Sequence, residues 1–190
     1  MPATFGFVNP PSVPRIPPGG PRELGIANWL VCRALSRAAG AADAHLFSTL
    51  GRTRGLFRGW LHYSGKLMPG GRLTRHDSEL VILRVAHLRE CGYEWDHHVR
   101  LGAKAGVTPD ILARVQDGPA ADGWRPGHAA LLRTVDQLVT TKEVTDDTWT
   151  DLAAHYDARR LIEIVLLITQ YDGLATTIAA LGIQRDTLPA

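Results

Sequence analysis

The sequence has only two cysteines, Cys32 and Cys91, which are too few for a disulfide framework. Reduced thiols in a cytoplasm are the simpler interpretation. The first residues lack the charged and apolar regions of a signal peptide, so we expect a cytoplasmic protein. No run approaches about eighteen uninterrupted apolar residues, and we therefore expect no membrane partner.

The chain also has little net charge. Its 21 Lys and Arg residues against 19 Asp and Glu residues give +2, and no basic block lies beside aromatic residues. Because nucleic-acid-binding domains usually carry a basic patch, we expect no nucleic-acid partner. With 190 residues, of which 45% are hydrophobic, the chain is long enough to bury the core of one domain.

Residues 1–21 hold seven prolines and three glycines, which predicts a Pro-rich N-terminal arm before a single domain over residues 22–190. The arm is either disordered or lies over the body or a neighbouring subunit. Four apolar side chains could anchor it: Phe5, Phe7, Val8 and Ile16.

The rest of the chain shows helical periodicity, and the alternating runs typical of strands are absent. We therefore predict an all-α domain of seven or eight helices. One helix is expected over residues 23–40. The last helix, from Asp157, contains LIEIVLLITQY and is apolar on nearly every face, so we expect it to be the central buried element.

The segment CGYEWDHH, residues 91–98, concentrates reactive side chains at the start of a predicted helix. At about 100° per residue, Cys91, Glu94 and His98 fall within roughly 60° of one another. An acid and a histidine thus share a face that is otherwise small and apolar, which is costly unless they are paired or used. Tyr93 and His97 form a neighbouring pair four residues apart.

The preceding helix has a similar anomaly, because Glu79 lies within the apolar run SELVILRVA. If the two helices form an antiparallel hairpin, Glu79 approaches Glu94 and His98. A glutamate beside a histidine in a site of low dielectric brings proton donors and acceptors near neutrality.

This pattern resembles the carboxymuconolactone decarboxylase and alkylhydroperoxidase D-like (AhpD-like) superfamily. Its redox members carry a glutamate, then CxxC, then a histidine four residues after the second cysteine. Glu79, Cys91 and His98 match three of these four positions, and Glu94 replaces the second cysteine. The resemblance covers roughly residues 45–183, and the YEWxxH core is similar to the non-redox branch.

The resemblance implies an AhpD-like helical bundle that forms a homo-oligomer, whether dimer, trimer or hexamer. It also implies an enzyme that needs no cofactor. In the redox branch the second cysteine attacks the peroxide, and this chain has a carboxylate at that position. A thiol peroxidase remains an alternative, with Cys32 as a partner thiol.

Two further alternatives remain open. Glu94 and His98, joined by Glu79 and by His62 or His97, would give mixed oxygen and nitrogen ligands for a metal. The same ionisable groups could instead form a buried network that fixes the helix pair in a non-catalytic ligand-binding or assembly domain.

We predict cofactor-free acid–base chemistry, without a metal, on a small-molecule substrate: an organic acid, a lactone or a carbonyl compound. His98 would donate or accept the proton, Glu79 would set its tautomer, and Glu94 would act as a second acid or base. Tyr93 would donate a hydrogen bond to an enolate or carbonyl oxygen. The predicted substrate-binding residues are Cys91, His62, Tyr63 and His97. A substrate carboxylate would need a cation, for which the candidates are Arg58, Lys66 and Arg84.

Overall fold

The computed structural model describes residues 11 and 13–187, and every regular element in this part of the chain is helical. Ten α-helices and one short 3₁₀ helix confirm the all-α prediction and exceed the seven or eight helices expected. In chain order they are α1 (Pro21–Leu24), α2 (Ile26–Ala39), α3 (His45–Leu50), η1 (Gly51–Thr53), α4 (Gly55–Leu67), α5 (Arg75–Leu88), α6 (Gly92–Lys104), α7 (Pro109–Asp117), α8 (Pro126–Thr140), α9 (Asp146–Ala153) and α10 (Ala158–Leu181).

The helix predicted over residues 23–40 is divided into α1 and α2 at Gly25. This residue has φ 75° and ψ 153°, a conformation that favours glycine and ends the first helix. Pro21, which falls in the predicted arm, is instead the first residue of α1, where its missing N–H leaves no helical bond unmade.

The central element is α5, which packs against α6, α7, α8 and α10. Every residue from Asp77 to His87 is buried. The prediction that the last helix is the central buried element is wrong, because α10 leaves Ile162 63% and Leu166 40% exposed. The charged residues of α5 concealed its burial: Arg84, for example, is buried against Asp136, with two bonds of 2.6 and 2.8 Å.

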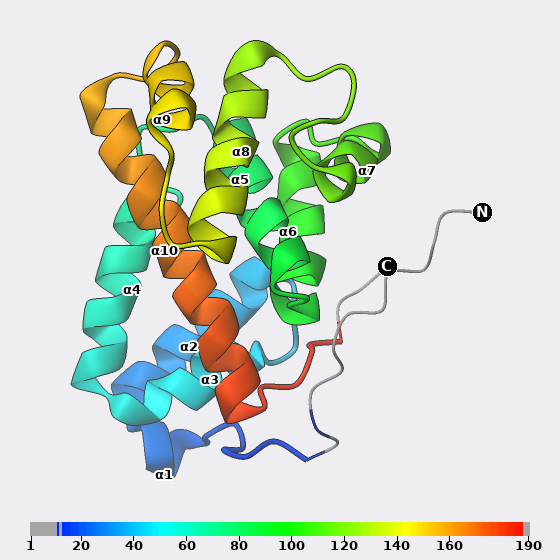
Figure 1. The fold of residues 1–190 in the computed structure, drawn as a ribbon. Helices are drawn as coiled ribbons and strands as arrows, with labels where there is room; N and C mark the ends of the chain where they lie inside the picture. The colour runs from blue at the N-terminus through cyan, green and yellow to red at the C-terminus, as the bar shows by residue number, and fades with distance from the viewer. Residues whose placement is uncertain (1–10, 12, 188–190) are drawn as a thin grey trace.

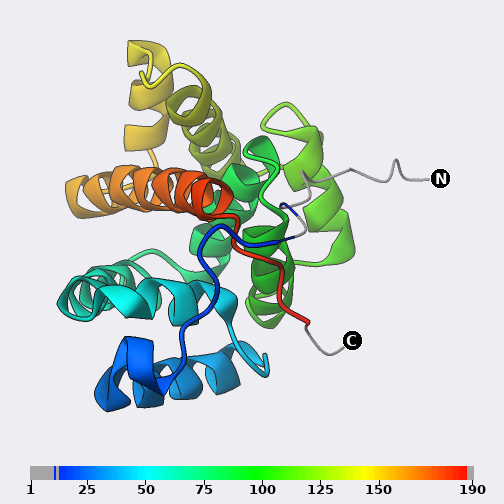
Figure 2. The same cartoon turned by 90° about the horizontal axis from the view of Figure 1, so that it is seen from below.

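The long helix α10 runs the length of the molecule beside α4 and α8 (Figure 1). Seen from below, it lies between the N-terminal helices α2–α4 and the pair α8 and α9 (Figure 2). By length and composition alone, α10 is long and apolar enough to cross a membrane, but the core helices of soluble proteins meet the same criteria. In its most apolar stretch of 18 residues, 33% is buried. A helix this apolar and this incompletely covered has an outer face available for other contacts.

The described part of the N-terminal arm lies against the body of the same chain. Backbone N–H groups of Arg15 and Ile16 donate to the Leu181 carbonyl at 3.1 and 3.4 Å, and that of Gly19 donates to the Ser48 carbonyl at 2.9 Å. Of the predicted anchors, Ile16 is 40% exposed. The others, Phe5, Phe7 and Val8, lie outside the described residues.

Candidate active site

The helices α5 and α6 form a hairpin that brings Glu79 against His98. A tight turn through Glu90, with φ 50°, connects the two helices. The Nδ1 atom of His98 lies 2.8 Å from Oε2 of Glu79, across 19 residues of sequence. The predicted approach of these two side chains is therefore confirmed.

Glu79 is bound through both carboxylate oxygens. Its side chain is fully buried, and its Oε1 accepts a hydrogen bond of 2.7 Å from Nη2 of Arg75, one turn earlier on α5. A buried carboxylate is costly without a partner, and the guanidinium compensates its charge. Arg75, Glu79 and His98 thus form a continuous chain of charge-assisted hydrogen bonds.

This chain of bonds fixes the imidazole of His98. Because the carboxylate of Glu79 can only accept, Nδ1 of His98 carries the proton and donates it. Nε2 is then the ring nitrogen left with a lone pair for a bound molecule. The His98 and Tyr171 rings also pack edge to face, with centroids 5.2 Å apart, which helps to hold the imidazole plane.

Glu94 lies one turn before His98 on the same face of α6 and is only 3% exposed. Neither carboxyl oxygen has a hydrogen bond of ordinary geometry. Burial raises the pKa of Glu94 well above its usual range; the Cys91 thiol, a weak donor, opposes the rise, and the negative charge of Asp172 adds to it. The surroundings of Glu94 therefore favour the protonated form of its carboxyl group.

Glu94 and His98 both line a cavity of about 450 Å³ enclosed by α2, α3, α4, α6 and α10. Most of its wall is apolar, with Trp60 and Leu101 among the lining side chains. Glu79 does not line it and lies behind His98. Buried, mostly apolar cavities with a few convergent polar groups are typical ligand sites. Tyr171 also lines the cavity, and burial raises the pKa of its hydroxyl well above the usual range.

The cations that line this cavity differ from those considered in the sequence. Arg37, Arg100 and Lys104 are lining residues. Arg58 instead bonds to Asn28 at 3.1 Å. Arg84 is held by Asp136 and by two backbone carbonyls, and Lys66 is exposed on α4; neither lines the cavity.

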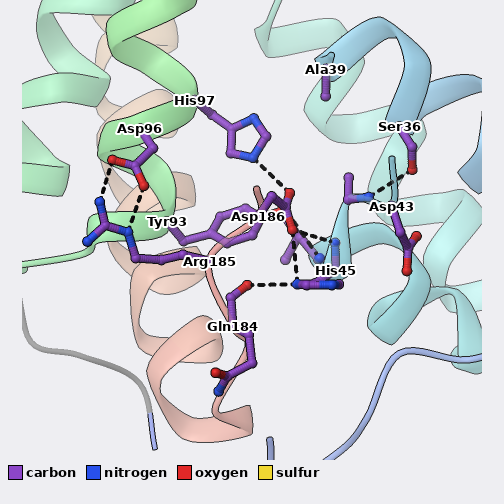
Figure 3. Close-up of polar contacts among 12 residues, drawn as sticks. Ser36, Ala39, Asp43, His45, Tyr93, Asp96, His97, Gln184, Arg185 and Asp186 are labelled. Carbon is purple, nitrogen blue, oxygen red and sulfur yellow. Dashed lines mark hydrogen bonds and ion pairs between the residues drawn. The ribbon is translucent and has the colours of Figure 1, made fainter. Parts of the chain in front are cut away.

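Tyr93 and His97 line the cavity but share a second buried carboxylate, that of Asp186 (Figure 3). The Tyr93 hydroxyl donates to Oδ2 of Asp186 at 2.8 Å, and Nε2 of His97 lies 2.9 Å from the same oxygen. The other oxygen, Oδ1, accepts the backbone N–H of His45 at 3.0 Å. The hydroxyl also accepts the N–H of Leu46 at 3.3 Å. Because its one proton is donated to Asp186, Tyr93 is not available to donate to a substrate oxygen in this arrangement.

The sequence profile of the Carboxymuconolactone decarboxylase family matches residues 54–137, a stretch that contains Glu79, Glu94 and His98. The chain is 25% identical over 112 residues to the uncharacterized protein YdfG of Bacillus subtilis (strain 168), covering 58% of this chain and 76% of YdfG. The solved AhpD core of a peroxidase-related protein from Ralstonia eutropha JMP134 superposes with a TM-score of 0.79 at 17% identity, over 92% of this chain and 93% of that one. Residues 54–137 therefore match the carboxymuconolactone decarboxylase family, and the chain has the AhpD-like fold. A peroxidase-related protein from Silicibacter sp. TM1040 also superposes with a TM-score of 0.79, at 12% identity over 96% of each chain.

In this chain with the AhpD-like fold, both cysteines are buried, and neither forms a disulfide. Burial, with the neighbouring Glu94, raises the pKa of Cys91 far above its usual range. Burial, with the charge of Asp43, raises the pKa of Cys32 to about 11, and its thiol donates to the Phe47 carbonyl at 3.2 Å. Reactive thiols need a lowered pKa and access, so the surroundings of both cysteines disfavour thiolate chemistry.

The remaining predicted binding residues lie away from the cavity wall. Cys91 caps the start of α6 beside Glu94 but is not a lining residue. His62 and Tyr63 are exposed on α4 and do not line the cavity either. Across the described residues, no group of three His, Cys, Asp or Glu side chains has the arrangement of a metal site.

Sequence reasoning missed several residues of this AhpD-like site. Asp186 lies 89 residues after His97, beyond the last helix, and no local pattern connects them. Tyr171 lay within the apolar LLITQY segment, where an aromatic residue is typical of a core. Arg100 and Lys104 follow His97 on α6 by three and seven residues, a spacing that places all three on one side of the helix and is the signal in the sequence that they share surroundings.

Proposed function

We propose that this chain is an enzyme of cofactor-free acid–base chemistry, acting on a small organic acid, lactone or carbonyl compound by isomerisation, decarboxylation or a related lyase step. One observation carries the proposal: a buried carboxyl group without a hydrogen-bond partner, Glu94, lines the same cavity as a histidine whose tautomer a buried carboxylate fixes. A base and an acid that line one cavity are the two groups that proton transfer needs.

The geometry supports the following roles. Nε2 of His98 removes a proton from a carbon beside a carbonyl group, while Glu94 donates its proton to the carbonyl oxygen, and the product is an enol. The imidazolium of His98 is stabilised by Glu79, whose charge Arg75 already partly compensates. Return of the two protons to different atoms completes an isomerisation. In a decarboxylation, the enolate left after loss of CO₂ takes up one proton instead.

Proton exchange with solvent tests this proposal across several classes of candidate substrate at once. A panel of β-keto acids, lactones and unsaturated ketones is incubated in D₂O, and loss of the signal from protons beside the carbonyl is followed by ¹H NMR. The protein should accelerate exchange for at least one class. His98→Gln and Glu94→Gln should each lower that rate by about 10²- to 10⁴-fold, the usual contribution of a general acid or base.

Cys91→Ser is the matched control, because it changes a neighbour of Glu94 that the proposed chemistry does not use, and it should retain the exchange. Exchange that survives both His98→Gln and Glu94→Gln contradicts the proposal. Peroxide consumption that is lost in Cys91→Ser would replace it with a thiol peroxidase. Ligand binding without exchange across the panel would leave a non-catalytic binding domain.

We also propose that the chain forms a homo-oligomer through the outer face of α10. Ile162 and Leu166, 63% and 40% exposed, lie four residues apart and so project from one side of this helix. Sedimentation velocity should show a species larger than one chain, and Ile162→Glu with Leu166→Glu should reduce its mass without loss of helical circular dichroism. Thr150→Glu with Ala154→Glu, at exposed positions near α9, is the control, and equal masses for the two variants would contradict this interface.

A further inference from the structure

Cations predominate among the charged residues on the cavity wall. Arg37 from α2, together with Arg100 and Lys104 from α6, lines the cavity, and the one acidic lining residue in the described part of the chain is Glu94. Burial raises the pKa of Glu94 and so disfavours a negative charge beside these three cations.

These cations lack the carboxylate partners that some other arginines of the chain have. Among the described residues, Arg37 and Lys104 have no side-chain hydrogen bond or ion pair, and Arg100 donates only to the Ala39 carbonyl at 3.1 Å. Elsewhere, Arg84 and Arg133 are each paired with an aspartate, at 2.6 and 2.8 Å. Three cations without a carboxylate partner among the described residues therefore line one cavity.

The cavity has two chemically different ends. Glu94 and His98 are buried at one end, whereas Arg37 and Lys104 are exposed at the other. Lys104 follows His98 by six residues, which places their backbones about 9 Å apart along the axis of α6 at about 1.5 Å per residue. The wall between them is mainly apolar and includes Leu101.

We propose that the cavity binds an amphipathic carboxylic acid, with its carboxylate at Arg37, Arg100 and Lys104 and its apolar body extending toward Glu94 and His98. The assignment of a reacting carbon to the inner end rests on the proposed function; the binding of the acid does not. Guanidinium and ammonium groups bind carboxylates through charge-assisted hydrogen bonds, and the apolar wall takes the hydrocarbon part.

This placement gives the bound carboxylate the role of an anchor. The cations stabilise its negative charge, which would be lost if it departed as CO₂, so they oppose its decarboxylation. The reacting carbon lies at the acid–base end instead, separated from the carboxylate by the length of the apolar wall. Among the reactions open to Glu94 and His98, the site therefore favours proton transfer at a carbon remote from the acid group.

Calorimetric titration with matched probes tests the anion site. The probes are ω-phenylalkanoates from phenylacetate to 6-phenylhexanoate, each compared with its uncharged amide. The wild-type protein should bind the preferred acid at least about tenfold more tightly than its amide, which corresponds to about 1.4 kcal/mol. In Arg37→Gln with Lys104→Gln, this preference should fall to within about twofold, while the affinity for the amide stays unchanged.

Arg22→Gln with Lys66→Gln is the control variant, because it removes the same charge from exposed positions that do not line the cavity. It should keep the preference for the acid. Equal affinity for acid and amide in the wild-type protein, no binding of either, or an equal loss in the control variant would each overturn the proposal. Glu94→Gln should abolish proton exchange yet keep the acid preference, so failure of the chemistry and failure of the anion site give different results.

Discussion

Glu94→Gln is expected to make the protein more stable than the wild type, by an amount that grows as the pH rises above about 4.5. The wild-type carboxyl is buried without a hydrogen bond of ordinary geometry, and its pKa is raised well above the value of 4.5 assigned to a free side chain. In the unfolded chain the same carboxyl ionises freely. Ionisation therefore favours the unfolded state of the wild type, and glutamine removes that effect.

The sign follows from proton linkage. Below pH 4.5 the folded and unfolded states of the wild type both hold the Glu94 proton, so this group contributes no pH dependence to the free energy of unfolding. Between 4.5 and the raised pKa of the folded state, only the folded protein holds the proton, so the free energy of unfolding falls by about 1.4 kcal/mol per pH unit. Above the folded-state pKa the loss stops. The stabilising contribution of the bound proton is thus present at low pH and lost as the pH rises.

Urea unfolding at several pH values between about 4.5 and 8 measures this effect as the difference between the variant and the wild type. The difference should rise with pH at up to about 1.4 kcal/mol per unit, with unchanged m-values. Glu143→Gln is the control, because Glu143 is exposed and should give a difference close to zero throughout. A flat difference for Glu94→Gln would mean that Glu94 is ionised in the folded protein and cannot be the proposed acid.

The parts of this site that the sequence predicted depend on local periodicity. The spacing of Glu94 and His98 places both on one face of any helix, and an antiparallel hairpin brings α5 back against α6. Glu79 was identifiable because one acid in an apolar run needs a partner. These inferences require only the geometry of a helix and the cost of a buried charge, and the bond between Glu79 and His98 agrees with them.

The parts that the sequence did not predict depend on how distant helices meet. Arg37 reaches the cavity because the end of α2 lies over α6, where Arg100 donates to the Ala39 carbonyl. Asp186, which contacts Tyr93 and His97, lies beyond the end of α10 in the sequence. Neither relation has a spacing that a single sequence reveals. The burial of α5 was concealed for a related reason, since paired charges inside a protein look in sequence like charges on its surface.

The replacement of Glu79 should have a large effect on both stability and chemistry. Glu79→Ala removes a fully buried carboxylate and leaves Arg75 and His98 without their partner. Breaking a buried pair in this way costs about 3 to 5 kcal/mol. Because the Arg75 side chain is 38% exposed and can turn toward water, we expect a loss of about 3 kcal/mol, the lower end of that range. Asp151→Ala, which breaks a pair of exposed side chains with Arg133, should cost less than about 1 kcal/mol in the same urea titration.

Glu79→Gln separates the positioning of His98 from stability alone. The amide oxygen can still accept the Nδ1 proton, so the fold should be retained, but the negative charge that stabilises the imidazolium is gone. We expect proton exchange to slow by at least about tenfold, and the ¹⁵N shifts of His98 to show a larger share of the other tautomer. A purely structural network predicts the reverse order, with stability lost and the exchange rate of the folded fraction unchanged. If Glu79→Gln is stable and its exchange is as fast as that of the wild type, Glu79 does not position His98, and the chain of bonds from Arg75 serves only to hold α5 against α6.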